Sequence, residues 1–469
     1  MIRLPILLLV ISVSGIAAAQ QAPEPKLEER LAAIVGRAGG LSSEEVARRS
    51  EETSRDVRAR SAEVRSAQAA VAQARAAFYP RATLTARYTR LSDTSTGALF
   101  NLVSAPSVGP GPVPPGTELV NIPLEFPVLV DNYTLQAQLS VPISDYFLRI
   151  PQGTGAAKSG AEAARQTEQV SRRQARLNGR VLYYQWAQAR LQIVVAEQAL
   201  EAAQAHLGDV KKAANVGAAS NADVLRVESQ VAAAELLVVR VKNLADLLET
   251  QLRTTMHDDS GRTYEIGEDL ATALGQAGAG DADVAAAGER RPEVKALSEA
   301  ASAARQQAKV ARAGVFPRLD AVGNLIYANP NPRIFPQSDS FEASWDVSLQ
   351  LTWTPFDIPS ARAQQRQAEA RAAQLDAQRA QVVDGVRIEV TQAENAVREA
   401  DAAVATTARG LAAAEESYRV RRVLFQNGRA TTVELTDAET ELTRARLEAI
   451  DARVAQRVAR ARLAHALGQ

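Results

Sequence analysis

The chain has 469 residues, of which 46% are apolar and only 4% aromatic, so its apolar content is mainly alanine, valine and leucine. That composition favours closely packed helices over a bulky globular core. The 54 basic side chains equal the 54 acidic ones, which leaves no net field for nucleic acid, and the absence of cysteine excludes disulfides, thiolate metal sites and cysteine nucleophiles.

The N-terminus has the pattern of a secretory signal. One arginine is followed by a mainly apolar run from Leu4 to Ile16 and by three alanines before Gln20. This pattern predicts a signal peptide over residues 1–19. The alternative is a retained membrane anchor, for which the run is short. Residues 20–42 are expected to form an N-terminal linker with one marginal helix.

Residues 43–256 are predicted to hold a first repeat of helix, two strands and long helical hairpin. The helix is expected to run without a break from Ser43 to a proline at position 80. The segment from Ser92 to Asp131 is expected to lack regular structure because it is rich in proline and glycine. The strands alternate apolar with polar residues, and their apolar positions are Leu84, Ala86 and Tyr88, then Tyr133, Leu135, Ala137, Leu139 and Val141.

The helical hairpin of the first repeat is expected from about Gly160 to Lys212, with a turn at Gly217 and a return from Asp223 to about Thr255. Residues 257–291 contain several glycines and are expected to form a compact connecting segment.

Residues 292–469 are predicted to form a second repeat with the same order of elements. A helix is expected over Pro292–Ala313, then strands over Leu319–Tyr327 and Trp345–Trp353, and then a second long hairpin that turns at Gly428. Its outbound helix has apolar residues every seven positions, which predicts coiled-coil packing: Val383, Val390, Val397, Val404, Leu411, Tyr418 and Phe425. Its return helix is expected to begin at a capping box and to pack through leucines, and these residues are Thr431 and Glu434, then Leu435, Leu442 and Leu463.

The duplication can be followed at single positions. Pro80 corresponds to Pro317, and Pro142 corresponds to Pro355. The turn motifs also match, because the spacing of Gly217, Ser220 and Asp223 recurs in Gly428, Thr431 and Glu434.

The last strand indicates a membrane. Its apolar residues alternate with polar ones, and Trp345 and Trp353 lie at its two ends, where interfacial aromatic residues belong. The alternative is a soluble sheet packed on one face. Four strands cannot close a barrel, so copies of the chain would have to assemble, and three copies would give twelve strands.

These motifs resemble those of the TolC-like outer-membrane efflux proteins over essentially the whole mature chain. The resemblance rests on the duplicated order of elements, on Pro80 and Pro317, and on the turns at Gly217 and Gly428. It implies a mainly α fold with membrane β-structure: a homotrimer with a 12-stranded β-barrel, four strands per chain, continued by a long α-helical coiled-coil barrel in the periplasm. It also implies an export duct in the outer membrane of a Gram-negative-type bacterium, surrounded by lipid and joined to an inner-membrane transporter through a periplasmic adaptor.

The resemblance also suggests a pore gate. The family's constricting ring of acidic residues matches Glu434 and Asp437, whose spacing places both carboxylates on one helix face. Crowding of these carboxylates in a trimer is expected to raise their pKa values. The structural alternative is that acids are favoured in a first helical turn by the helix dipole and the capping box. The family's gating tyrosine and arginine correspond to Phe425 and Ala430, so the hydroxyl and the charge are missing, although Arg429 is adjacent.

The two hairpin turns are the adaptor contacts that the resemblance implies. Their glycines are also expected simply to end helices in the left-handed conformation. The residues of these turns are Gly217, Ser220, Asp223, Gly428, Arg429 and Thr431.

Catalytic, cofactor and metal sites are not expected. The chain has no phosphate loop, dinucleotide fingerprint or serine elbow. His257, Asp258 and Asp259 are adjacent in a loop and are expected to be solvated rather than to bind a metal. The alternative to a duct is a periplasmic coiled-coil scaffold that binds partners without forming a pore.

Overall fold

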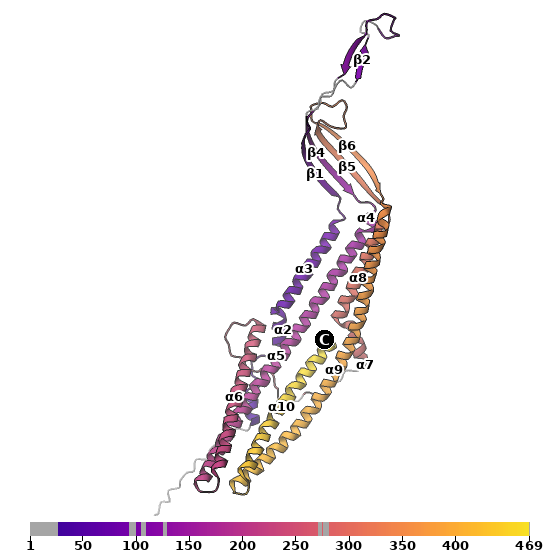
Figure 1. The fold of residues 1–469 in the computed structure, drawn as a ribbon. Helices are drawn as coiled ribbons and strands as arrows, with labels where there is room; N and C mark the ends of the chain where they lie inside the picture. Colours follow the sequence, from indigo (N-terminus) through magenta and orange to yellow (C-terminus); the bar gives the residue numbers. More distant parts are fainter. Residues whose placement is uncertain are drawn as a thin grey trace, which may run out of the picture. The chain divides into compact units, whose positions relative to one another are not determined.

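The computed structural model describes residues 27–92, 100–104, 109–124, 129–270, 274 and 281–468. The expected signal peptide over residues 1–19 lies outside these ranges, as does the first part of the expected linker, and both stay predictions. The described chain is mainly helical (Figure 1). Its α-helices are α1 (Leu27–Ala32), α2 (Ser43–Thr53), α3 (Arg55–Ala76), α4 (Asp145–Leu148), α5 (Ile150–Asn215), α6 (Asn221–Met256), α7 (Asp281–Arg290), α8 (Pro292–Arg312), α9 (Ile358–Gln426) and α10 (Thr432–Ala466). Across the described ranges, no helix combines the length and the apolar character that a membrane span needs.

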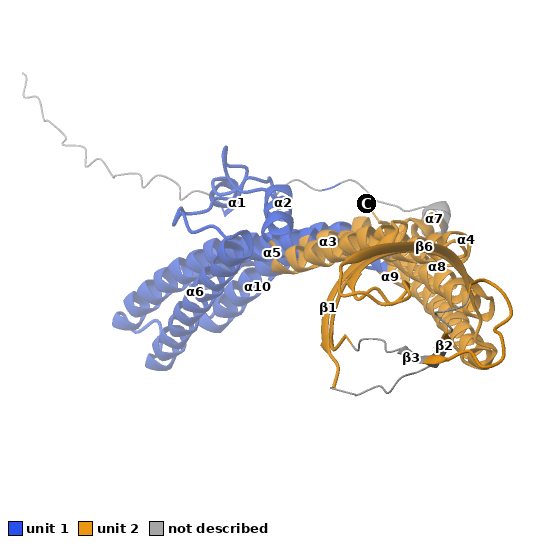
Figure 2. Cartoon of the chain, turned by 90° about the horizontal axis from the view of Figure 1, so that it is seen from above, with its two compact units in different colours: residues 1–53, 176–278, 393–463 blue, residues 54–175, 279–392, 464–469 orange. Residues whose placement is uncertain are grey.

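The chain divides into two compact units, each built from distant segments of the sequence (Figure 2). Both units draw on both sequence repeats, because each long helical hairpin contributes residues to each unit. Unit 1 contains residues 1–53, 176–278 and 393–463, and unit 2 contains residues 54–175, 279–392 and 464–469.

Unit 2 contains a four-stranded antiparallel sheet, which confirms the four predicted strands. Its strand order is β1-β4-β5-β6, so β1 and β6 are the edge strands. The register places Leu84 opposite Ala137, Ala137 opposite Leu325 and Leu325 opposite Trp345. Apolar side chains of all four strands therefore share one face. The strands are β1 (Arg81–Arg90), β4 (Asp131–Val141), β5 (Arg318–Asn329) and β6 (Glu342–Thr352).

The two faces of this sheet differ in polarity in an unusual way. On the apolar face Leu84 is 84% exposed and Trp345 is 76% exposed. On the opposite face Asn324 donates a hydrogen bond to Asp346 at 3.1 Å, and Arg333 makes an ion pair with the same carboxylate at 2.5 Å. A sheet that faces water presents its polar side outward. Here the apolar side is uncovered, which is the pattern of a strand that faces lipid.

The long loop before β4 is not free of regular structure, so that prediction was wrong. Strands β2 (Phe100–Ser104) and β3 (Val120–Leu124) pair antiparallel within it. Both are short apolar pieces between the proline and glycine clusters, and backbone pairing of such pieces satisfies polar groups that neither could satisfy alone.

Two helix boundaries also differ from the prediction. The expected continuous first helix is broken at Ser54, whose side chain accepts a hydrogen bond from the backbone N–H of Val57 at 3.3 Å and so begins α3 as a new helix. Helix α5 begins at Ile150, ahead of the expected start near Gly160. Glycines weaken the sequence signal there, yet a Cβ at Gly155 would lie 3.5 Å from the side chain of Gln306, so packing supports the helix.

The core of unit 1 contains several of the few aromatic side chains. Trp186 and Tyr183 are fully buried, and the rings of Trp186 and Tyr264 meet edge to face at 6.4 Å. Helix α2 approaches α5 so closely that a Cβ at Gly179 would lie 2.5 Å from Ser50 Oγ. Composition alone did not indicate this aromatic cluster.

The seam of the second hairpin is confirmed. Val390 and Val397 of α9 are buried, and Leu411 and Tyr418 pack against a cluster that includes Leu442 of α10. The spacing of seven residues therefore marks the buried stripe of this helix pair.

Candidate functional site

The two hairpin turns in unit 1 have the same backbone structure. Gly217 and Gly428 have φ values of 77° and 67°, the left-handed conformation that favours glycine. One residue later, the N–H of Ala218 bonds to Ala213 O and that of Arg429 bonds to Leu424 O, both at 2.8 Å. These are the bonds of a Schellman motif, so the prediction that both glycines end helices is confirmed.

Each return helix begins with a reciprocal capping box, as the repeat predicted. Ser220 N–H donates to Asp223 at 2.9 Å, and Asp223 N–H donates to Ser220 Oγ at 3.2 Å. Thr431 and Glu434 make the same two bonds at 2.9 and 3.3 Å. Glu434 thus has the capping role that was the structural alternative to a gate, and this role is compatible with a gating role as well.

The Glu434 carboxylate is held by an ion pair as well as by the hydrogen bonds of the capping box. Its Oε1 lies 2.5 Å from Arg421 Nη1 on the preceding helix. The hydrogen bond from the Thr431 backbone, together with Arg421, lowers the pKa of Glu434 below its usual value. The rise in pKa expected from carboxylate crowding is a property of several chains together, and within one chain the direction is the opposite.

The other predicted tip residues are placed at the surface or beside the turn. Asp437 is exposed on the same helix as Glu434, one turn further along. Arg429 is exposed within the turn itself. Phe425, at the position of the family's gating tyrosine, is partly buried, and its ring lies 5.2 Å from that of His206.

A buried polar cluster behind the tips was missed by sequence reasoning. His206 on α5 and Glu439 on α10 are 4% and 7% exposed, and Gln230 of α6 completes the group. The signal was present, because Glu439 lies between Leu435 and Leu442 at seam spacing, where an apolar residue is normal.

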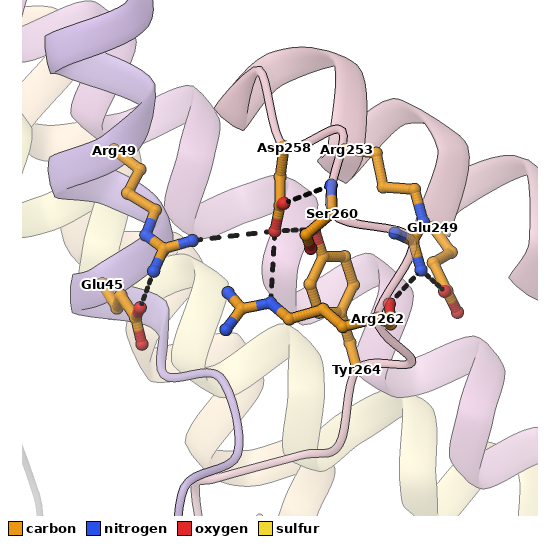
Figure 3. A network of polar contacts seen from close by, with 8 residues as sticks. All are labelled: Glu45, Arg49, Glu249, Arg253, Asp258, Ser260, Arg262 and Tyr264. Atoms are coloured by element: carbon orange, nitrogen blue, oxygen red, sulfur yellow. Dashed lines mark hydrogen bonds and ion pairs between the residues drawn. The ribbon is translucent and has the colours of Figure 1, made fainter.

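In the loop after α6, His257 and Asp259 are exposed, as expected, whereas Asp258 is anchored by neighbouring side chains. His257 ends the helix in the left-handed conformation, with φ of 48°. Asp258 then accepts hydrogen bonds from Ser260 N–H at 3.1 Å and from Tyr264 Oη at 2.7 Å (Figure 3). Arg49 of α2 also approaches Asp258, at 3.8 Å.

The pKa values of two side chains in this loop are shifted in opposite directions. Hydrogen bonds from Ser260 and Tyr264 hold the pKa of Asp258 well below its usual range. Burial, reinforced by the bond to Asp258, raises the pKa of Tyr264 to about 12. Within the described ranges, no group of His, Cys, Asp and Glu side chains has the size and arrangement of a metal site. The contact between Arg49 and Asp258 joins this loop to α2.

Comparison with known proteins identifies the architecture. A model described as outer membrane efflux protein matches residues 46–256 and 284–469, and these two stretches agree with the duplication seen in the sequence. Among curated proteins, no sequence matches this chain.

Solved structures give the same result for the fold. The chain is similar to the outer-membrane channel OprN, with 21% identity and a TM-score of 0.73 over 91% of this chain and 89% of that one. It is similar to the outer membrane protein VceC of Vibrio cholerae, with 17% identity and a TM-score of 0.72 over 91% and 96%. It also resembles the open state of the MtrE outer membrane channel of Neisseria gonorrhoeae, with 18% identity and a TM-score of 0.68 over 91% and 88%. At these identities the likeness concerns the fold alone.

Proposed function

Since this chain belongs to the outer membrane efflux protein family, we propose that three copies join their sheets into one channel, which is closed at the tips of the helical hairpins. Family membership makes the chain the outer-membrane duct of a tripartite efflux system, with a large periplasmic portion, and not an enzyme. We therefore reject the alternative of a periplasmic coiled-coil scaffold, because a scaffold has no need of a sheet whose apolar face is exposed.

The proposed assembly rests on the open sheet of unit 2. Its edge strands β1 and β6 have no further strand beside them among the described residues, and its apolar face is exposed. In lipid an open edge leaves backbone groups without hydrogen-bond partners. Pairing of β1 with β6 of the next copy removes both edges, and three copies give a closed barrel of twelve strands.

The proposed gate is the pair Glu434 and Asp437 at the start of α10. Three copies around one axis would bring six carboxylates together. Such a ring attracts cations and would favour protonation of its members, in opposition to the effect of Thr431 and Arg421 within each chain. The capping role of Glu434 holds the carboxylate in a fixed place at the mouth, so the structural and gating roles support each other.

The two turns are the proposed contact for the periplasmic adaptor, which would connect the duct to the inner-membrane transporter. Gly217 and Gly428 give both turns the same compact backbone, and each is followed by a capping box with one acid, Asp223 or Glu434. A partner could therefore meet two similar surfaces on each chain.

Single-channel conductance in a planar bilayer tests both parts of this proposal. The purified protein should form a pore that conducts poorly and is blocked by divalent cations. The double variant Glu434→Ala, Asp437→Ala should conduct more and lose most of the cation block. Glu441→Ala is the matched control, because Glu441 is an exposed acid further along the same helix.

The two parts fail in different ways. Absence of any pore, together with a monomeric mass in detergent, would contradict the trimeric channel. A pore whose cation block is the same in the double variant and in Glu441→Ala would contradict the gate alone.

A further inference from the structure

A buried polar group connects the two helical hairpins of unit 1 behind their tips. His206 Nδ1 lies 3.0 Å from Glu439 Oε2, and Gln230 Nε2 donates to the same oxygen, also at 3.0 Å. The ring of Phe425 packs edge to face on the imidazole. These four residues, which we name the His206 cluster, come from α5, α6, α9 and α10, so every helix of both hairpins contributes one.

The position of the cluster couples it to the tips of both hairpins. His206 precedes Gly217 by as many residues as Glu439 follows Gly428, so the contact lies at the same depth below both turns. Its bonds join the first hairpin to the second. Any movement that separates the tips of the two hairpins must lengthen or break them.

Within the described part of the chain, the cluster has two unsatisfied atoms, Gln230 Oε1 and His206 Nε2. His206 Nε2 is buried, and no atom of the described residues is placed to form a hydrogen bond with it. With a neutral imidazole, Nδ1–H donates to an ionised Glu439 and Nε2 keeps a bare lone pair. Proton uptake by the imidazole changes this. An imidazolium carries N–H on both nitrogens, so Nε2 becomes a donor while Nδ1–H still donates to Glu439.

The imidazolium form therefore has a buried N–H group, at Nε2, without an acceptor among the described residues. Burial of an unpaired donor is costly, more so when the ring is charged. Separation of the hairpins gives Nε2 access to water and removes this cost. Acid should thus shift the balance towards separated tips, and neutral pH should hold them together.

Charged groups of both signs lie around the cluster. On α9, Tyr418 has a pKa raised by its burial and by the charge of Glu439, and Arg422 lies near it. On α10, Arg446 is also near Tyr418. Between α5 and α6, Lys211 pairs with Glu228 at 2.8 Å, so these two charges largely offset each other.

We propose that the His206 cluster is a proton-sensitive latch, which holds the two hairpins together at neutral pH and releases them in acid. This inference rests on the proposed role of the chain as a duct closed at its tips. It adds a control that acts through proton concentration and does not require the acids at the mouth.

Distances between spin labels test the latch directly. The chain has no cysteine, so Val216→Cys and Arg429→Cys would place one label on each exposed turn. Labelled chain mixed with an excess of unlabelled chain isolates the distance within one copy. When the pH is lowered from about 7.5 to about 5.5, the fraction with separated tips should rise about tenfold.

Variants separate the latch from a general effect of acid. His206→Gln with Glu439→Gln keeps polar side chains of similar size but removes both titrating groups, so the rise should vanish. Asp209→Asn with Glu441→Gln changes two exposed acids on the same helices, so the rise should remain. Gln230→Leu removes one donor to Glu439 and should move the midpoint of opening to higher pH, and this variant serves if the first does not fold.

The latch is overturned if the label distance does not respond to pH, or if the response survives in His206→Gln with Glu439→Gln. Failure of the proposed gate looks different. If labels separate in acid while conductance stays unchanged, the latch stands and the constriction lies elsewhere than the tips.

Discussion

Arg421 Nη1 lies 2.5 Å from Glu434 Oε1, so an ion pair connects the end of α9 to the capping box that begins α10. The carboxylate thus receives two hydrogen bonds from Thr431 and one charged contact from Arg421. In this arrangement Glu434, the acid proposed to form the gate, also stabilises the backbone of the turn at Gly428.

The first prediction concerns the pH dependence of this turn. The folded pKa of Glu434 is lowered, so its contribution to stability is present above the unfolded pKa and is lost as pH falls through the folded pKa. Glu434→Gln should lower the thermal midpoint, measured by circular dichroism in detergent, at about pH 7, and the difference from wild type should disappear in strong acid. Glu441→Gln is the control and should change little. A difference that persists in acid would contradict the role of the charge.

The second prediction tests the cap of the first hairpin. Ser220→Ala removes the side chain that accepts from Asp223 N–H, and loss of such a cap costs about 0.5–2 kcal/mol of helix stability. Hydrogen exchange measured by mass spectrometry should become faster in the first turn of α6. Thr250→Ala, an exposed site near the C-terminal end of the same helix, should leave that turn unchanged. Equal effects of the two variants would mean that the box does not hold the turn.

The third prediction concerns the junction after α6. Asp258 helps to raise the pKa of Tyr264 to about 12, so Asp258→Asn should lower that pKa, although burial of the ring remains. Absorbance titration near 295 nm, with Tyr264→Phe to identify the signal, measures the shift. Asp259→Asn is the matched control, because Asp259 is adjacent but exposed. An unchanged titration in Asp258→Asn would show that burial alone sets the pKa.

Much of this fold could be predicted because its signals are periodic. The spacing of seven from Val390 to Val397 marks a stripe that is buried in the structure, and the alternation through Trp345 marks a strand with one apolar face. The turns at Gly217 and Gly428 were predictable because only glycine readily adopts their backbone conformation. Such features depend on neighbours in the sequence.

The missed features depend on residues that meet only in three dimensions. Asp258 looked solvated because its partners Tyr264 and Arg49 gave no local signal. His206 and Glu439 are more than two hundred residues apart, and neither segment has a sequence signal that indicates contact with the other. Glu434 was predictable as a cap, but its pairing with Arg421 was not, since that contact crosses the turn. The candidate gate stays a prediction, because it depends on several chains around one axis.

The fourth prediction tests which face of the sheet meets lipid, using two adjacent residues of the central strand β4. Leu135 is 51% exposed on the apolar face, whereas Gln136 points to the other face, where Asn324 lies 3.4 Å away. An arginine on a lipid-facing strand costs about 2–4 kcal/mol near the middle of the bilayer. Leu135→Arg should therefore greatly reduce the amount of folded protein in the outer-membrane fraction, measured by heat-modifiable gel mobility. Gln136→Arg should insert normally and change ion selectivity instead. The reverse pattern would place the apolar face inside the channel and overturn the proposed barrel.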